Sequence, residues 1–265
     1  MRNLGLVLFG VMAVAVAVSA RAQTLPPPAP LLLGPAPAPV ATGDPARDAF
    51  NRGQAARNRG DYAAAIAALD ESIRLRPDVA APYAARAGAW MDKGDLDHAI
   101  ADYDRYLSRE PGDVVALQNR GLAWFYKGRW DQAVADYDKA NALAPSAAVY
   151  ELRGDALIGK GDLDGALASF DRAVALSDRG GEAGNLGQYL AGRCEIRLRR
   201  SEWSLAIADC DAALATPAKP IRARYYRGLA RLRLGETEAG KADLAAVEAQ
   251  APGLGAQFAA QGLRP

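Results

Sequence analysis

Histidine is nearly absent from this sequence, and cysteine is scarce. With His98 as the one histidine, a metal site or a catalytic dyad would have to be built almost entirely from carboxylates. Those carboxylates fall in pairs such as Asp102 with Asp104, and residues two apart on a helix point in roughly opposite directions. The two cysteines do not form a CxxC redox motif. We therefore expect no catalytic centre, metal or cofactor, and a protein that is not an enzyme.

A surplus of charge of one sign is also missing. The whole chain has a formal net charge of +1, and removing Arg2 and Arg21 with the N-terminal segment leaves 30 basic and 31 acidic side chains. Nucleic acids and anionic lipid surfaces attract proteins with a strong excess of lysine and arginine. Neither is an expected partner.

Residues 1–22 are typical of a secretory signal peptide. Arg2 precedes an apolar run from Leu4 to Val18, and a small-x-small triplet follows at residues 20–22. The run is shorter than the roughly 20 residues that span a membrane as a helix, which disfavours an uncleaved anchor. No cysteine follows for lipid attachment. We predict cleavage after Ala22 and a periplasmic or secreted mature chain without a membrane span.

Residues 23–45 form a proline-rich linker. Proline removes backbone N–H donors and disfavours helix in the residue before it, so the segment is typical of an extended, semi-rigid tether. It is either a passive spacer or a docking segment for a proline-recognising domain, with Leu31 to Leu33 as its apolar part.

From residue 46 onward the sequence repeats itself. Three residue types recur at intervals of 34 residues, namely Gly60, Gly94 and Gly128, then Ala65, Ala99 and Ala133, then Pro77, Pro111 and Pro145. A fourth unit follows 33 residues on, although Asp178 stands where proline is expected. We place units 1 to 4 at residues 46–178, a glycine-rich break at 179–187, units 5 and 6 at 188–252, and a C-terminal cap at 253–265.

Each unit is expected to be an antiparallel pair of helices. In the third unit, apolar residues recur at helical spacing up to Gly128, where a residue without Cβ can take the left-handed conformation that ends a helix. A second amphipathic segment then runs from about Trp130 to Leu143, and Pro145 prevents it from continuing. We expect Tyr137 and the tryptophans of this unit to fill space between hairpins.

This pattern resembles the tetratricopeptide repeat, a 34-residue helix-turn-helix family. The small residue of the first helix falls on Gly53, Ala87, Gly121, Gly154, Cys194 and Gly228, and the glycine between the helices is replaced by Ser201 in unit 5. The resemblance implies an all-α, right-handed superhelical solenoid of about six hairpins. It also implies that the first helices line a concave wall.

One arginine precedes the small residue in every unit, at Arg52, Arg86, Arg120, Arg153, Arg193 and Arg227. These arginines either form a ladder of cations for an acidic ligand or pair with the regularly placed aspartates of nearby second helices. The regularity favours the second interpretation.

Cys194 and Cys210 are the only cysteines, and they fall on the two helices of unit 5. In an oxidising compartment they can form a disulfide, and otherwise they are two buried thiols. Both alternatives stay open at this point.

The wall of first helices is the predicted binding surface. Its candidate contacts share the face turned away from the paired helix, and they are Phe50, Gln54, Gln118, Leu122, Phe125, Tyr126, Glu151, Arg199 and Tyr225. Aromatic and amide groups mixed with charges of both signs suit an extended peptide. We therefore expect an adaptor of the bacterial cell envelope that binds a protein or peptide. The alternative is a carrier or regulatory subunit of an envelope assembly, such as one for polysaccharide export or peptidoglycan remodelling, with the chemistry in a partner.

Overall fold

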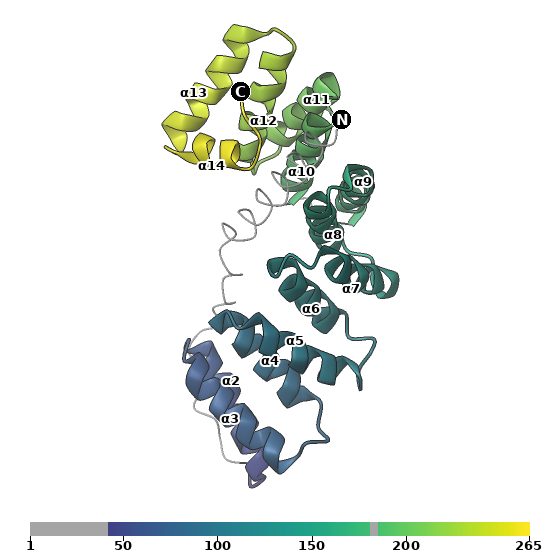
Figure 1. Ribbon diagram of the computed structural model, residues 1–265, viewed down its shortest axis with the longest axis vertical. Helices are drawn as coiled ribbons and strands as arrows, with labels where there is room; N and C mark the ends of the chain where they lie inside the picture. Colours follow the sequence, from purple (N-terminus) through teal and green to yellow (C-terminus); the bar gives the residue numbers. More distant parts are fainter. Residues whose placement is uncertain (1–41, 181–184) are drawn as a thin grey trace, which may run out of the picture. The chain divides into compact units, whose positions relative to one another are not determined.

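The computed structural model describes residues 42–180 and 185–265, so the predicted signal peptide and most of the proline-rich linker lie outside the described residues. Within those residues there are thirteen helices and no strand (Figure 1). The helices are α2 (Pro45–Asn58), α3 (Tyr62–Leu75), α4 (Ala81–Lys93), α5 (Leu96–Leu107), α6 (Val114–Tyr126), α7 (Trp130–Leu143), α8 (Ala147–Lys160), α9 (Leu163–Gly180), α10 (Leu186–Arg199), α11 (Trp203–Ala215), α12 (Ile221–Arg233), α13 (Thr237–Gln250) and α14 (Leu254–Ala260). The described part of the chain is all-α, as predicted.

The chain divides into two compact units between Ala144 and Pro145. The N-terminal unit contains the hairpins α2–α3, α4–α5 and α6–α7, and the C-terminal unit contains α8–α9, α10–α11 and α12–α13, followed by α14. Within each unit, every hairpin packs on the next. The described residues thus hold the six predicted hairpins, three in each unit.

The glycines between paired helices end the first helix of each pair. Gly94 and Gly161 have φ values of +86° and +85°, the left-handed conformation that a residue without Cβ adopts at no steric cost. Ser201 replaces glycine in the fifth hairpin and still adopts φ +62°, at a cost of about 1 kcal/mol. Most second helices therefore begin directly after this turn, and Asp61 and Asp95 cap two of them by accepting hydrogen bonds from backbone N–H groups.

Small residues on the first helices make room for large side chains. A Cβ on Gly121 would lie 2.7 Å from Tyr137 Cε1, and one on Gly154 would lie 2.6 Å from Phe170 Cε2. Tyr137 is fully buried and packs against Gly121 of its own hairpin, and its role between hairpins stays a prediction. Phe170 packs against Gly154 of its own hairpin, and its ring also lies against Gly192 of the next hairpin, so it fills space between hairpins as well. Close backbone approach is what these glycines contribute.

The repeated arginines bridge neighbouring hairpins. Arg120 donates to both carboxylate oxygens of Asp136 in its own hairpin, at 2.8 and 2.6 Å, and to Asp104 of the preceding hairpin at 2.7 Å. The same double pairing recurs at Arg86 with Asp102 and Asp70, at Arg193 with Asp209 and Asp171, and at Arg227 with Asp243 and Asp211. Their hydrogen bonds to these carboxylates raise the pKa values of Arg86 and Arg120. The structural interpretation of the arginines is confirmed at these four positions.

The paired aspartates serve different partners. Asp102 is buried and binds Arg86 of its own hairpin, whereas Asp104 binds Arg120 of the next one. Two carboxylates that face different arginines cannot converge on one bond as a general acid and base do.

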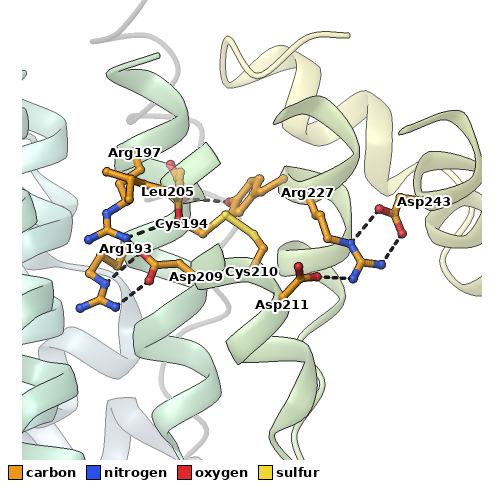
Figure 2. The surroundings of a disulfide bond; sticks show 11 residues. Arg193, Cys194, Arg197, Leu205, Asp209, Cys210, Asp211, Arg227 and Asp243 are labelled. Carbon is orange, nitrogen blue, oxygen red and sulfur yellow. Dashed lines mark hydrogen bonds and ion pairs between the residues drawn. A yellow bond between two sulfur atoms is a disulfide. The ribbon is translucent and has the colours of Figure 1, made fainter. Parts of the chain in front are cut away.

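A disulfide joins Cys194 of α10 to Cys210 of α11, with the Cα atoms 5.6 Å apart. Figure 2 shows the bond between two arginine clusters, Arg193 with Asp209 on one side and Arg227 with Asp211 and Asp243 on the other. Both cysteines are fully buried in the core of the C-terminal unit. The bond ties together the two helices of the hairpin whose turn lacks glycine.

Helices α9 and α10 both extend into residues 179–187, where the sequence predicts a glycine-rich break between repeats. Helix α9 runs to Gly180 and α10 begins at Leu186. No proline ends α9 in the way that Pro77 follows α3, so its last turns continue past the usual repeat length. Phe170 of α9 and Gly192 of α10 are in contact, so both flanks of this stretch belong to one packed unit.

Candidate functional site

The N-terminal unit has a groove along its first helices, which we call the first-helix groove. Its volume is about 300 Å³, and it is lined by Phe50, Gln54, Arg57, Ala81, Ala84, Ala85, Tyr103, Tyr106, Asp113, Val115, Ala116 and Asn119. Helices α2, α4 and α6 supply most of these residues, and α5 supplies the two tyrosines. Three alanines of α4 in the middle leave the space that larger side chains would fill.

The lining combines apolar and polar groups. Val115 is 63% exposed, which is unusual for a β-branched apolar side chain, and Phe50 of α2 lines the same groove. Gln54 and Asn119 offer amide groups that both donate and accept hydrogen bonds. An extended peptide needs apolar contact for its side chains and such groups for its backbone.

Asp113 is a fixed negative charge at the rim of this groove. It caps α6 by accepting a hydrogen bond from the backbone N–H of Ala116 at 2.9 Å, and it accepts another from the Tyr106 hydroxyl at 2.6 Å. Burial opposes its ionisation, but these hydrogen bonds outweigh burial and hold the pKa of Asp113 below its usual value. The same hydrogen bond raises the pKa of Tyr106 to about 12.

Arg57 and Tyr103 also line the groove, and each is held in place by a hydrogen bond. Arg57 Nε donates to Asp92 Oδ2 at 2.6 Å, and its side chain remains 37% exposed. Burial raises the pKa of Tyr103 to about 12, and its hydroxyl forms a hydrogen bond with Asn119. The groove therefore presents one cation, one anion and the amides of Gln54 and Asn119 to a ligand.

Comparison with known proteins identifies the fold. The family model described as the tetratricopeptide repeat matches residues 50–114 and 119–180. The first four hairpins are therefore tetratricopeptide repeats. Proteins of this family are protein-interaction scaffolds that bind protein or peptide partners, and their fold is a non-catalytic one. No curated protein sequence matches the chain.

Solved structures similar to this chain are tetratricopeptide proteins as well. MamA from Desulfovibrio magneticus RS-1 is 22% identical with a TM-score of 0.60, over 66% of this chain and 96% of that one. YrrB, described as a TPR protein with an unusual peptide-binding site, is 18% identical with a TM-score of 0.56, over 69% and 92%. PilF from Pseudomonas aeruginosa is 17% identical with a TM-score of 0.62, over 78% and 93%. At these identities the likeness shows the fold alone.

The structure places the predicted contacts of the N-terminal unit unevenly. Phe50 and Gln54 line the first-helix groove. Gln118, Leu122 and Tyr126 are partly exposed on α6 but are not among its lining residues. Burial raises the pKa of Tyr126. That these three residues contact a partner, on a surface of the first helices wider than this groove, stays a prediction.

The structure corrects the prediction that Phe125 is a contact residue. Its side chain is 2% exposed, and its ring packs edge-on against Trp130 and Tyr126, with centroids 5.2 and 5.9 Å away. The ring is turned toward the second helix of its own hairpin, so the prediction that it contacts a ligand is wrong.

The predicted contacts of the C-terminal unit already have partners. Glu151 accepts a hydrogen bond from Arg222 at 3.5 Å, and Arg199 pairs with the buried Glu195 at 3.0 Å. Tyr225 is 4% exposed, because the C-terminal segment covers it and accepts a hydrogen bond from its hydroxyl. The prediction of Tyr225 as an accessible groove residue is therefore wrong for this conformation of the chain.

Tyr106 and Asp113 line the groove and are absent from the predicted contacts. They come from a second helix and from the loop that follows it, whereas the prediction considered first helices alone. Asp113 directly precedes an apolar helical segment, which is typical of an N-cap, and Tyr106 follows Tyr103 by one helical turn. The N-cap position is the signal that indicates Asp113, and the spacing of one helical turn is the signal that indicates Tyr106.

Within the described ranges, no group of three or more His, Cys, Asp and Glu side chains could hold a metal ion. His98 is exposed near the start of α5, with its Nδ1 2.8 Å from Asp95 Oδ2 and its ring stacked on Trp90. Of the helices that the structure describes, none is long and apolar enough to cross a membrane.

Proposed function

We propose that this tetratricopeptide protein is a non-enzymatic adaptor of the bacterial cell envelope that binds a partner peptide in its first-helix groove. The observation that carries the proposal is the lining of that groove, in which exposed Val115 lies among the amides of Gln54 and Asn119. Arg57 and Asp113 add one charge of each sign, so the groove can fix the direction of a bound peptide.

The envelope location rests on two features of the chain. Residues 1–22 have the pattern of a cleavable signal peptide, with the cut proposed after Ala22. The Cys194–Cys210 disulfide supports the same location, because structural disulfides persist in oxidising compartments.

Photocrosslinking in living cells tests the proposal. A photoreactive amino acid at Val115 should capture an envelope protein, whereas one at Leu143, an equally apolar residue of the same unit that is 55% exposed outside the groove, should not. Equal capture from both positions, or a tagged chain that stays in the cytoplasmic fraction, would contradict the proposal.

A pair of neighbouring amides provides the matched control. Asn119→Ala removes a lining amide, and Gln118→Ala removes one that lies outside the lining on the same helix. We expect the first variant to weaken partner retention by about fivefold to tenfold and the second, at a predicted contact outside the groove, to have a smaller effect. Loss of retention in the Gln118 variant alone would place the binding surface elsewhere on α6.

A further inference from the structure

Residues 261–265 lie across first helices of the C-terminal unit. They follow α14, turn at Gly262 with φ +83°, and continue without helical structure. Three side chains of the first helices bind their backbone carbonyl oxygens. Arg199 of α10 donates to the Gln261 oxygen at 3.5 Å, and from α12 Tyr225 donates to Leu263 at 2.9 Å and Arg233 to Arg264 at 3.4 Å.

One apolar side chain anchors this segment. Leu263 is 5% exposed and belongs to the core cluster that contains Tyr225, Tyr226 and Leu229. Phe258 of α14 packs on the two tyrosine rings, with centroids 4.8 and 5.5 Å away. Backbone acceptors bound by donors on a helical wall, together with one buried leucine, are how a peptide is held in a groove.

Helix α14 and residues 261–265 together make few buried contacts with the rest of the C-terminal unit. Helix α14 has no buried residue, and Gly253, with φ +82°, precedes it. The attachment therefore depends on Leu254, Phe258 and Leu263, on one hydrogen bond from the buried Tyr225, and on two from the arginines Arg199 and Arg233. Segments with few buried apolar contacts are the ones that open locally at low free-energy cost.

We propose that this face of α10 and α12 is a second peptide-binding site, occupied in this conformation by the chain's own residues 261–265. Its ligand is an extended segment of a partner protein with a leucine anchor, and flanking carbonyl or carboxylate groups face Arg199 and Arg233. A carboxylate in either place forms charge-assisted hydrogen bonds, which are stronger than those of the neutral carbonyl it replaces. The internal segment thus competes with the partner and sets its apparent affinity.

Peptide binding to a truncated chain tests this site. The probe is a labelled peptide of the chain's own residues 257–265, and binding is measured by fluorescence anisotropy. We expect a chain that ends at Ala260 to bind the probe at least about tenfold more tightly than the full chain, because the internal segment no longer competes. A probe carrying Leu263→Asp should not bind. A segment that only caps the last hairpin would leave no saturable site after truncation.

Full-length variants keep the test decisive if the truncated chain fails to fold. Leu263→Ala weakens the internal anchor and should increase probe binding by about tenfold, whereas Leu234→Ala, at an exposed leucine of the same unit, should not. Adding Tyr225→Phe to the Leu263→Ala chain removes a donor and should reduce probe binding about fivefold. Equal probe affinity for the full chain and the Leu263→Ala chain would overturn the proposal. The first-helix groove of the N-terminal unit takes no part in this measurement, so its own test stands or fails separately.

Discussion

At the scale of single residues, glycine at two places decides how closely α8, α9 and α10 pack. Phe170 is fully buried between Gly154 of its own hairpin and Gly192 of the next. Gly154→Ala places a Cβ 2.6 Å from Phe170 Cε2, so we expect it to lower the free energy of unfolding by about 2 kcal/mol. Urea denaturation measures this change.

The same substitution at Gly112 is the control for overpacking. An added Cβ there meets no atom within 4 Å, so Gly112→Ala should leave the urea midpoint nearly unchanged. Equal effects of the two substitutions would show that backbone flexibility, and not contact with Phe170, explains the loss.

The arginine bridges support a second prediction at this scale. Asp136 is 3% exposed and binds Arg120 through both oxygens, so Asp136→Ala leaves a largely buried cation with Asp104 alone. We expect a loss of about 2–3 kcal/mol, measured by urea denaturation. In contrast, Glu238→Ala removes the partner of Lys241 from a pair that is 91% and 65% exposed, and it should not change stability measurably.

At the scale of one helix, Asp113 couples the stability of α6 to pH. The pKa of this carboxyl is below its usual value in the folded chain, so the ionised group stabilises the fold above about pH 4. That contribution disappears as the pH falls through the lowered pKa. Asp113→Asn should therefore reduce the free energy of unfolding near neutral pH and have a smaller effect near about pH 2.5. An equal effect at both values would mean that ionisation of Asp113 contributes nothing.

The helices themselves are predictable from the sequence because the residues that end them act locally. Glycine at Gly94 and Gly161 and proline at Pro77 act on their own backbone, so spacing alone indicates where each hairpin turns or stops. The end of α9 is less predictable. Without proline, the length of that helix depends on packing against neighbours.

The candidate site is only partly predictable, because the exposure of a side chain depends on residues outside its own helix. Helical spacing puts Phe125 and Tyr225 on outward faces, but Trp130 covers one and residues 255–263 cover the other. Phe50 and Gln54 line the first-helix groove, and their contact with a partner stays a prediction. A contact between residues about forty positions apart leaves no trace in a repeat pattern.

At the scale of the whole molecule, the disulfide distinguishes the two units. Both cysteines lie in the C-terminal unit, in a loop with a sequence separation of 16, for which loop closure predicts about 3 kcal/mol of stabilisation. Reduction should speed amide hydrogen exchange in α10 and α11. The helices α2 to α7 should keep their exchange rates, and mass spectrometry of peptic fragments resolves both. Faster exchange throughout the chain would contradict independent stability of the units.

The doubled arginine bridges have a consequence for how such a chain can lengthen. Arg86 and Arg120 are 34 residues apart, and each meets one carboxylate of its own hairpin and one of the hairpin before. A duplicated 34-residue segment inserted between them would bring a new arginine together with both of its aspartates. At every new junction between hairpins, the arginine would then be paired with both of its aspartates. The last hairpin marks where this growth stops, since α13 has Asp243 for its own arginine but Ala245 where a further hairpin would find its carboxylate.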